Sequence, residues 1–176
     1  GANAQITPRP LTVTYSGVDR VYDGTTVATV TTTDNRVAGD SMSIVRTAAF
    51  ADKDVAYDGS STVISKAVSV SGVSLSGTDA DNYSVASTGN TTAKITPKVL
   101  TVTYTGVNKM YDGDLVGAVT TSDDRVVGDV FSVNWSASYA DKNVGNAKPL
   151  SVTGVSLSNP AGTTTVDATN YSVSST

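Results

Sequence analysis

Hydrophobic and polar residues alternate along several segments of the chain. Leu11, Val13 and Tyr15 alternate with threonines, and the same pattern returns over residues 100–104, which lie 89 positions further along. Alternation with a period of two is typical of a β-strand that buries one face. The sequence therefore predicts a strand near the start of each of two related segments.

A longer alternating segment follows in each half of the chain. Its larger side chains are Met42, Ile44, Arg46, Ala48 and Phe50 in the first half, and Phe131, Val133, Trp135, Ala137 and Tyr139 in the second. One face of each predicted strand should enter a core. We interpret Trp135 as a packing residue, with a sugar-stacking ligand contact as the alternative. A further strand is expected across Gly72 and across Gly154, kinked or bulged at the glycine.

One long sequence segment occurs twice, at 6–24 and again at 95–113. Such a period is too long for a solenoid rung and suits a small domain. We expect 1–7 to be the closing strand of a preceding repeat, 8–96 the first repeat, and 97–176 a second repeat that lacks its closing strand. Prolines at the junctions favour stiff, extended geometry, which predicts an end-to-end, elongated arrangement.

An unpaired sheet edge is a template for another strand. We therefore hypothesise that Ala2–Ile6 of one molecule adds to the second repeat of its neighbour, although a monomer is the simpler expectation.

Composition indicates an all-β class. The 176 residues include sixteen acidic side chains, all Asp, and are rich in Thr, Ser, Val, Asn and Gly, which favour strands and turns. Two small β domains, β-grasp-like or immunoglobulin-like sandwiches, fit this composition. The chain has no Cys and no His, which excludes thiol nucleophiles, His-based triads and the usual zinc sites. We therefore expect no enzyme and no cofactor.

Charge and hydropathy limit the classes of partner that the sequence predicts. The net charge is −4, and no basic cluster offers a surface for nucleic acid or anionic lipid. No apolar run is long enough to span a membrane. Neighbouring repeats of the same chain are the expected partners.

Two Tyr-Asp-Gly motifs are predicted to form tight turns. Asp accepts local backbone hydrogen bonds and Gly adopts positive φ, with Tyr as an apolar anchor. The turn residues are Tyr22, Asp23 and Gly24 in the first motif and Tyr111, Asp112 and Gly113 in the second. A ligand-binding loop is the alternative. A third copy at 57–59 lies in a seven-residue insertion, which we expect to be a surface hairpin loop.

Several other side chains are weaker candidates. Tyr83 and Tyr171 each follow an Asp by four positions, which resembles a tyrosine corner or a plain turn before a strand. Calcium is considered because carboxylates cluster in sequence, although their spacing matches no EF-hand loop. The calcium candidates are Asp79, Asp81, Asp123, Asp124 and Asp129. An intramolecular isopeptide bond stays open.

The chain resembles the YDG-type repeat found in tandem in large bacterial adhesins of the filamentous-haemagglutinin kind, which are exported by two-partner secretion. The resemblance rests on the Ile-Thr-Pro opening, the Tyr-Asp-Gly motif, Ala-Asp-Lys-x-Val, Val-Ser-Gly-Val-Ser-Leu-Ser and Asp-Ala-x-Asn-Tyr-Ser-Val, in the same order in both halves, apart from two loop insertions. It implies an extracellular module on the bacterial surface, serving adhesion and biofilm formation, and it brings no catalytic residues.

Two functions follow as expectations. The first is a structural repeat in the stalk or passenger of an adhesin, which projects a binding region. The alternative is a binding module whose loops of variable length, or Trp135, contact glycan, matrix protein or another cell.

Overall fold

A computed structural model describes residues 1–174, and they form two compact units. The first unit comprises 1–21 and 25–96. The second comprises 97–174 together with Tyr22–Gly24, so the first Tyr-Asp-Gly motif belongs to the second unit. Within residues 1–174 the regular structure consists of strands and two short 3-10 turns, which confirms the all-β class.

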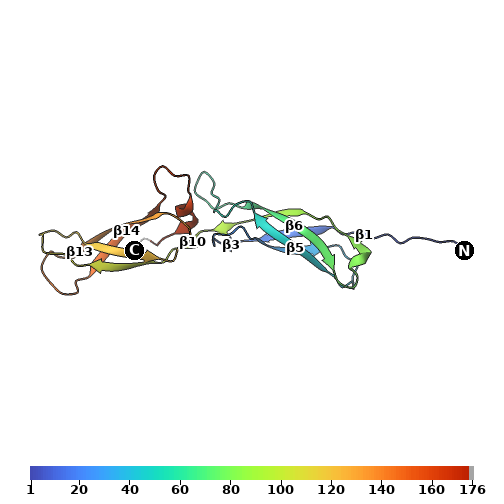
Figure 1. The fold of residues 1–176 in the computed structure, drawn as a ribbon, viewed down its shortest axis with the longest axis horizontal. Helices are drawn as coiled ribbons and strands as arrows, with labels where there is room; N and C mark the ends of the chain where they lie inside the picture. The colour runs from blue at the N-terminus through green and yellow to red at the C-terminus, as the bar shows by residue number, and fades with distance from the viewer. Residues whose placement is uncertain (175–176) are drawn as a thin grey trace. The chain divides into compact units, whose positions relative to one another are not determined.

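The first unit contains nine strands and one 3-10 turn (Figure 1). They are β1 (Arg9–Pro10), β2 (Val13–Val18), β3 (Arg20–Val21), β4 (Thr29–Asp34), β5 (Ser43–Phe50), β6 (Lys66–Ser76), η1 (Ala80–Asn82), β7 (Tyr83–Ser84), β8 (Gly89–Ala93) and β9 (Ile95–Thr96). Antiparallel pairing joins β2 to β4 and builds the three-stranded sheet β5-β6-β8. Two short parallel pairs, β1-β7 and β3-β9, complete the unit.

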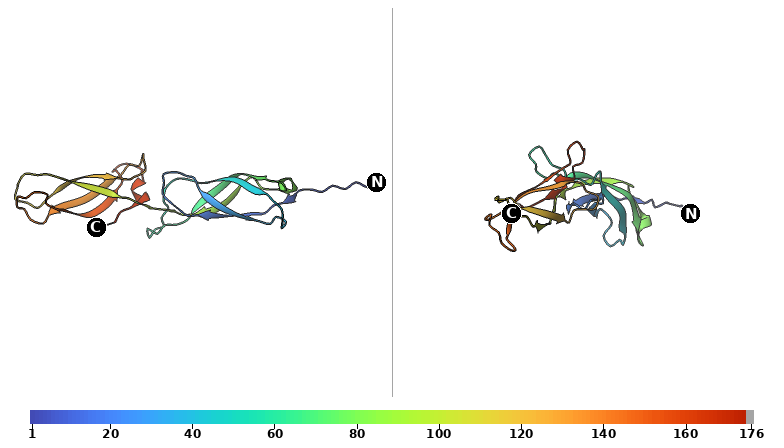
Figure 2. Two further views of the ribbon diagram at one scale, coloured as in Figure 1. Left: turned by 90° about the horizontal axis from the view of Figure 1, so that it is seen from below. Right: turned by 60° about the vertical axis from the view of Figure 1, so that its left-hand side comes forward.

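The second unit repeats most of this architecture. Its elements are β10 (Lys98–Val99), β11 (Val102–Val107), β12 (Ala118–Asp123), β13 (Ser132–Tyr139), β14 (Leu150–Ser158), η2 (Asp167–Asn170) and β15 (Tyr171–Ser172). The pairs β11-β12, β13-β14 and β10-β15 match β2-β4, β5-β6 and β1-β7. Figure 2 shows these strands wrapped around each unit's interior. Among residues 97–174, no strand pairs with β14 where β8 pairs with β6.

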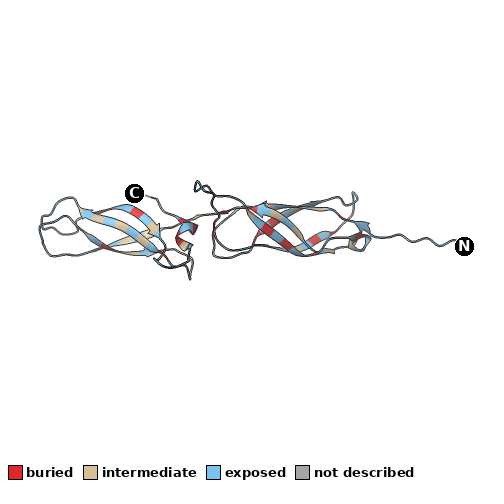
Figure 3. Ribbon diagram, turned by 90° about the horizontal axis from the view of Figure 1, so that it is seen from above, coloured by how far each residue is buried: buried red, intermediate tan, exposed pale blue. Residues whose placement is uncertain are grey.

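The strands form where alternation predicts them. Along β5 and β13, inward positions alternate with exposed ones, and the alternation is visible as red or tan and blue bands in Figure 3. The predicted bulges are confirmed, because the β5-β6 and β13-β14 ladders each shift register opposite the glycine. Gly72 and Gly154 adopt φ values of 61° and 66°, which a side chain would disfavour.

The insertion in the first repeat is a hairpin, as predicted. Tyr57 and Val63 form an antiparallel bridge, and the Asp58 carboxylate accepts hydrogen bonds from the backbone N–H groups of Ser60 and Thr62. The loop thus satisfies its own polar groups and lies on the surface.

An arginine–aspartate pair recurs in both units. Arg36 makes a two-point ion pair with Asp34, and Arg125 does so with Asp123; in each pair the shortest N–O distance is 2.6 Å. Both arginines also donate to a backbone carbonyl six residues ahead, and the Arg125 guanidinium lies 3.8 Å from the Phe131 ring centre. The two-point hydrogen bond lowers the pKa of Asp34 and of Asp123.

Candidate functional site

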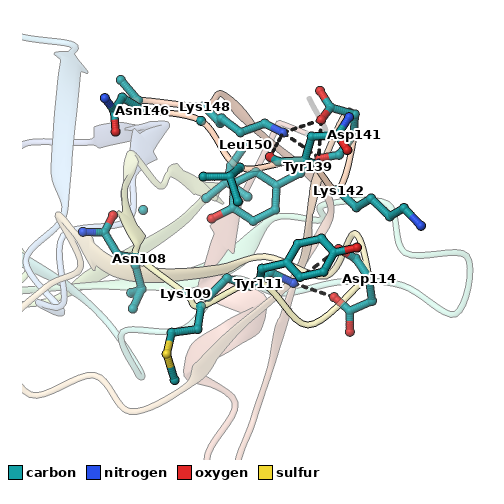
Figure 4. A pocket seen from close by; sticks show the side chains of 17 residues that line it. Asn108, Lys109, Tyr111, Asp114, Tyr139, Asp141, Lys142, Asn146, Lys148 and Leu150 are labelled. Atoms are coloured by element: carbon teal, nitrogen blue, oxygen red, sulfur yellow. Dashed lines mark hydrogen bonds and ion pairs between the residues drawn. The ribbon is translucent and has the colours of Figure 1, made fainter.

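A groove in the second unit has a volume of about 700 Å³. One wall is the end of β11 with the segment 108–111, and the other is the start of β14 with the loop 141–148. Figure 4 shows side chains from both walls around the opening, with Tyr139 and Leu150 between them. We call this surface the groove.

Lysine–aspartate pairs border the groove on both walls. Lys109 donates to Asp112 at 2.8 Å and to Asp114 at 2.5 Å, and these hydrogen bonds raise the pKa of Lys109. Lys148 donates to the Asp141 carboxylate at 2.5 Å and lowers the pKa of Asp141. Both ammonium groups lie about 6 Å from the centre of the Tyr139 ring, at 5.8 and 6.0 Å. The rim is therefore charged, and the floor is aromatic and aliphatic.

The corresponding surface of the first unit is filled by the chain itself. There β8 pairs with β6, and β9 pairs with β3 in parallel. Ala93 is buried and Ile95 is 0% exposed. Phe50, Val55 and Val68 are all buried, whereas Tyr139, Val144 and Leu150, which occupy the matching positions, are partly or fully exposed. The groove is thus the place that residues 89–96 occupy in the first unit.

Backbone contacts fix residues 89–96 in the first unit. Lys94 donates its N–H to the Asp19 carboxylate at 2.7 Å and accepts from the Arg20 N–H at 3.0 Å. Gly17 on β2 allows the close approach, because a Cβ at this position would lie 2.3 Å from the carbonyl oxygen of Thr92. In the groove, Asn108 and Gly106 stand at the positions of Asp19 and Gly17.

A second arrangement surrounds the buried carboxylate of Asp129. Tyr22 donates its hydroxyl to Asp129 at 2.8 Å, and Tyr171 donates at 2.7 Å. The two tyrosine rings meet edge to face, with centres 5.5 Å apart and an interplanar angle of 72°. Tyr171 also accepts the backbone N–H of Val126 at 2.8 Å. Burial, followed by the hydrogen bond to Asp129, raises the pKa of Tyr171.

The first unit has the same pair without the additional tyrosine. Tyr83 accepts the N–H of Val37 at 2.8 Å and donates to Asp40, and this hydrogen bond raises the pKa of Tyr83. Each tyrosine therefore reaches a backbone group, as in a tyrosine corner, but across more than forty residues. Beside Asp40 and Tyr83 lies a pocket of about 350 Å³, lined also by Ile6–Arg9, Val37, Asp81 and Asn82.

Burial differs between the two copies of this arrangement. Asp129 and Asn170 are buried in the second unit, whereas Asp40 is half-buried and Asn82 is exposed in the first. Val126 packs so close to Gly24 that a Cβ on Gly24 would lie 2.6 Å from it, while Val37 is exposed. The segment Tyr22–Gly24 accounts for this additional burial in the second unit.

The two Tyr-Asp-Gly motifs have similar backbones and different surroundings. Gly24 and Gly113 adopt φ values of 79° and 83°. Tyr22 is only 2% exposed, whereas Tyr111 is 61% exposed and lines the groove. The sequence suggested the turns, but nothing local to Tyr22 pointed to Asp129, which lies 107 positions away.

The calcium candidates serve separate local roles. Asp79 accepts the N–H of Ser41, and Asp124 accepts from Lys98 and from the N–H of Thr101. Asp81 lies exposed in η1, and Asp123 and Asp129 have the partners given above. Over residues 1–174, no group of three or more Asp, Glu, His or Cys side chains is placed to hold a metal ion.

Two further features lie outside the groove, namely the Trp135 side chain and an ion pair between Lys66 and Asp52. Trp135 is half-buried on the inward-facing side of β13, together with Val133 and Ala137. The Lys66 side chain is nearly buried and pairs with Asp52, whose side chain is 56% exposed. The hydrogen bond from Lys66 lowers the pKa of Asp52, and the exposed Asp52 side chain keeps the ion pair accessible to water. No helix within the described residues is long and apolar enough to cross a membrane.

Comparison with known families gives one match, which occurs twice. The model described as the YDG domain matches residues 7–92 and again residues 96–176. Comparison with curated proteins gives no match, and comparison with solved structures gives none.

Proposed function

Because the chain belongs to the YDG domain family, with two of these domains in tandem, we propose that it is a structural repeat module in the stalk or passenger of a large bacterial adhesin. The adhesin would be of the filamentous-haemagglutinin kind, exported by two-partner secretion and displayed outside the cell. The role of the module is to project a binding region of the adhesin away from the cell surface.

One observation carries this proposal. The two domains repeat the elements that hold their frameworks together: the two-point arginine–aspartate pair, the tyrosine–aspartate pair and the glycine bulge. The side chains of the repeated arginine–aspartate and tyrosine–aspartate pairs are buried or half-buried and serve packing. Repetition of a framework is what an array of spacers requires.

The second candidate function is adhesion by the module itself, and the unequal loops favour it. The hairpin around Tyr57–Val63 is present in the first repeat only, and the loop at Asn159–Gly162 is an addition of the second. Loops carried on a rigid framework are frequent binding sites.

A binding screen separates the two functions. The chain is tested on a glycan array and on immobilised matrix proteins, beside a variant that lacks the seven-residue insertion and a Trp135→Phe variant. The spacer role predicts no saturable ligand for any of the three proteins. A ligand that is lost with the insertion or with Trp135 would establish the adhesive role and overturn the spacer.

A further inference from the structure

We propose that the groove of the second unit binds residues 3–8 of a second copy of this chain as an added β-strand, while Tyr111 of the groove-bearing copy enters the Asp40–Tyr83 pocket of the strand-donating copy. The result is a head-to-tail association, and it is independent of the adhesin role proposed above.

The first argument is that the groove has a filled counterpart. In the first unit the same surface holds residues 89–96, whose buried anchors are Ala93 and Ile95. The groove presents Tyr139, Val144 and Leu150 at the positions where the first unit has the buried Phe50, Val55 and Val68, and it leaves them accessible. The groove therefore fits an extended segment that carries a small apolar side chain and, two positions later, a branched one.

The second argument is that the chain carries a matching segment. Residues 3–8 read Asn-Ala-Gln-Ile-Thr-Pro, against Thr-Ala-Lys-Ile-Thr-Pro at 92–97. Ala4 and Ile6 stand at the positions of the two anchors, and Ile6 is 99% exposed in the first unit. Burying such an isolated, exposed isoleucine side chain removes apolar surface from water and so favours association.

The groove also has the polar groups that such a strand needs. In the first unit the backbone of Lys94 bonds to the Asp19 carboxylate and to the Arg20 N–H. Asn108 and Lys109 occupy these positions in the groove, so an amide oxygen and a backbone N–H are available for Gln5. Pro149 replaces Ala67 on the neighbouring strand and contributes no N–H there. Recognition therefore depends on the anchors and on the 106–109 wall.

The third argument concerns the tyrosine. In the covalent pair of repeats, Arg20–Val21 pairs with Ile95–Thr96, and the next residue, Tyr22, donates to Asp129. Lys109–Met110 would pair with Ile6–Thr7 in the same way, and the next residue is Tyr111. Its target is Asp40, which within residues 1–174 accepts a side-chain hydrogen bond from Tyr83 and borders the 350 Å³ pocket. The strand and the tyrosine thus belong to one joint.

The first test uses a synthetic peptide of residues 1–9 added to the isotopically labelled chain. Amide resonances that line the groove, around Asn108 and Val144, are expected to shift in a saturable manner. A peptide with Ile6→Asp should fail to shift them. A chain with Gly106→Ala should also fail to respond to the original peptide, because a Cβ at the matching Gly17 would collide with the backbone of Thr92, which the added strand's backbone would replace in the groove. Absence of shifts, shifts elsewhere, or binding that survives Ile6→Asp would overturn the proposal.

Folding of the Gly106→Ala chain is checked separately. In the unliganded groove its new Cβ meets only the end of the Leu150 side chain, at 3.2 Å, which is able to move. Its thermal unfolding should match that of the original chain. If it does not, the Ile6→Asp peptide, which leaves the folded chain untouched, decides the outcome.

The second test is sedimentation of the whole chain over a wide concentration range. We expect the average mass to rise with concentration, and we expect Ile6→Asp and Tyr111→Ala each to shift the midpoint at least tenfold. Val127 is also 99% exposed and lies outside both contacts, so Val127→Asp is the matched control and should leave the midpoint unchanged. A single monomeric species at every concentration, or equal effects of all three variants, would overturn the proposal.

Discussion

At the scale of single residues, buried or half-buried carboxylates organise each domain. Asp129 accepts two tyrosine hydroxyls, and Asp34 and Asp123 are each held by an arginine. A buried charge is costly unless it is paired or hydrogen-bonded, so each carboxylate specifies the position of its partners. The residues around these carboxylates should therefore be sensitive to small changes.

Tyr171→Phe is expected to destabilise the second unit by about 1–3 kcal/mol, because it leaves the Val126 N–H without its acceptor and removes one donor from Asp129. Denaturant unfolding followed by the fluorescence of Trp135, the single tryptophan of the chain, measures the effect. The matched control is Tyr111→Phe, at an exposed tyrosine, and it should change stability by much less. Equal effects of the two variants would contradict the account.

Acid should destabilise the protein through the two arginine-held aspartates. Their folded-state pKa values are lowered, so their contribution is complete above the unfolded value of about 3.9 and is lost as the pH falls below it. Melting temperatures from pH 7 to pH 2.5 should therefore drop most steeply below about pH 4. The double variant Asp34→Asn, Asp123→Asn should melt lower at pH 7 and show a shallower decline in acid. An unchanged slope would refute this reading.

At the scale of elements, alternation and glycines predicted much of the fold. The strands at β2, β5, β11 and β13, the bulges and the inserted hairpin all lie where the local pattern placed them. Local patterns carry no information on pairings between distant segments. For that reason the sequence indicated a turn at Tyr22–Gly24 but not its burial against Asp129, and it grouped carboxylates that the fold uses separately.

The groove was even less accessible to sequence reasoning. The groove's walls and floor come from β11, β13, β14 and two loops that only the fold brings together. Its chemical character, an aromatic floor with lysine–aspartate pairs on the rim, required side-chain positions. The hypothesis that Ala2–Ile6 adds to a neighbouring repeat stays a prediction.

Gly17 and its counterpart Gly106 give a prediction at the element scale. Gly17→Ala should destabilise the first unit by about 1–3 kcal/mol, because the new Cβ would lie 2.3 Å from the Thr92 carbonyl oxygen and 2.9 Å from the Ala93 Cβ. Gly106→Ala in the second unit meets a single movable side-chain atom and should be nearly neutral. Circular dichroism melts of the two variants make the comparison. A similar loss in both would mean that β8 does not approach β2 as described.

At the scale of the whole chain, the second unit takes in a segment of the first repeat. The second compact unit includes Tyr22–Gly24, which lies in the sequence of the first repeat. A repeat protein in which each unit completes the next gains cooperativity along the array. The spacer role and the head-to-tail joint both build on this framework.

The most direct test of whether the second unit depends on Tyr22–Gly24 is the effect of Tyr22→Ala on the unfolding of that unit. Trp135 lies on β13 of that unit and reports its denaturation. Loss of a buried aromatic side chain, together with its hydrogen bonds to Asp129, should lower the stability measured at Trp135 by about 3–5 kcal/mol, whereas Tyr111→Ala should leave it nearly unchanged. An unchanged Trp135 transition in Tyr22→Ala would contradict the account.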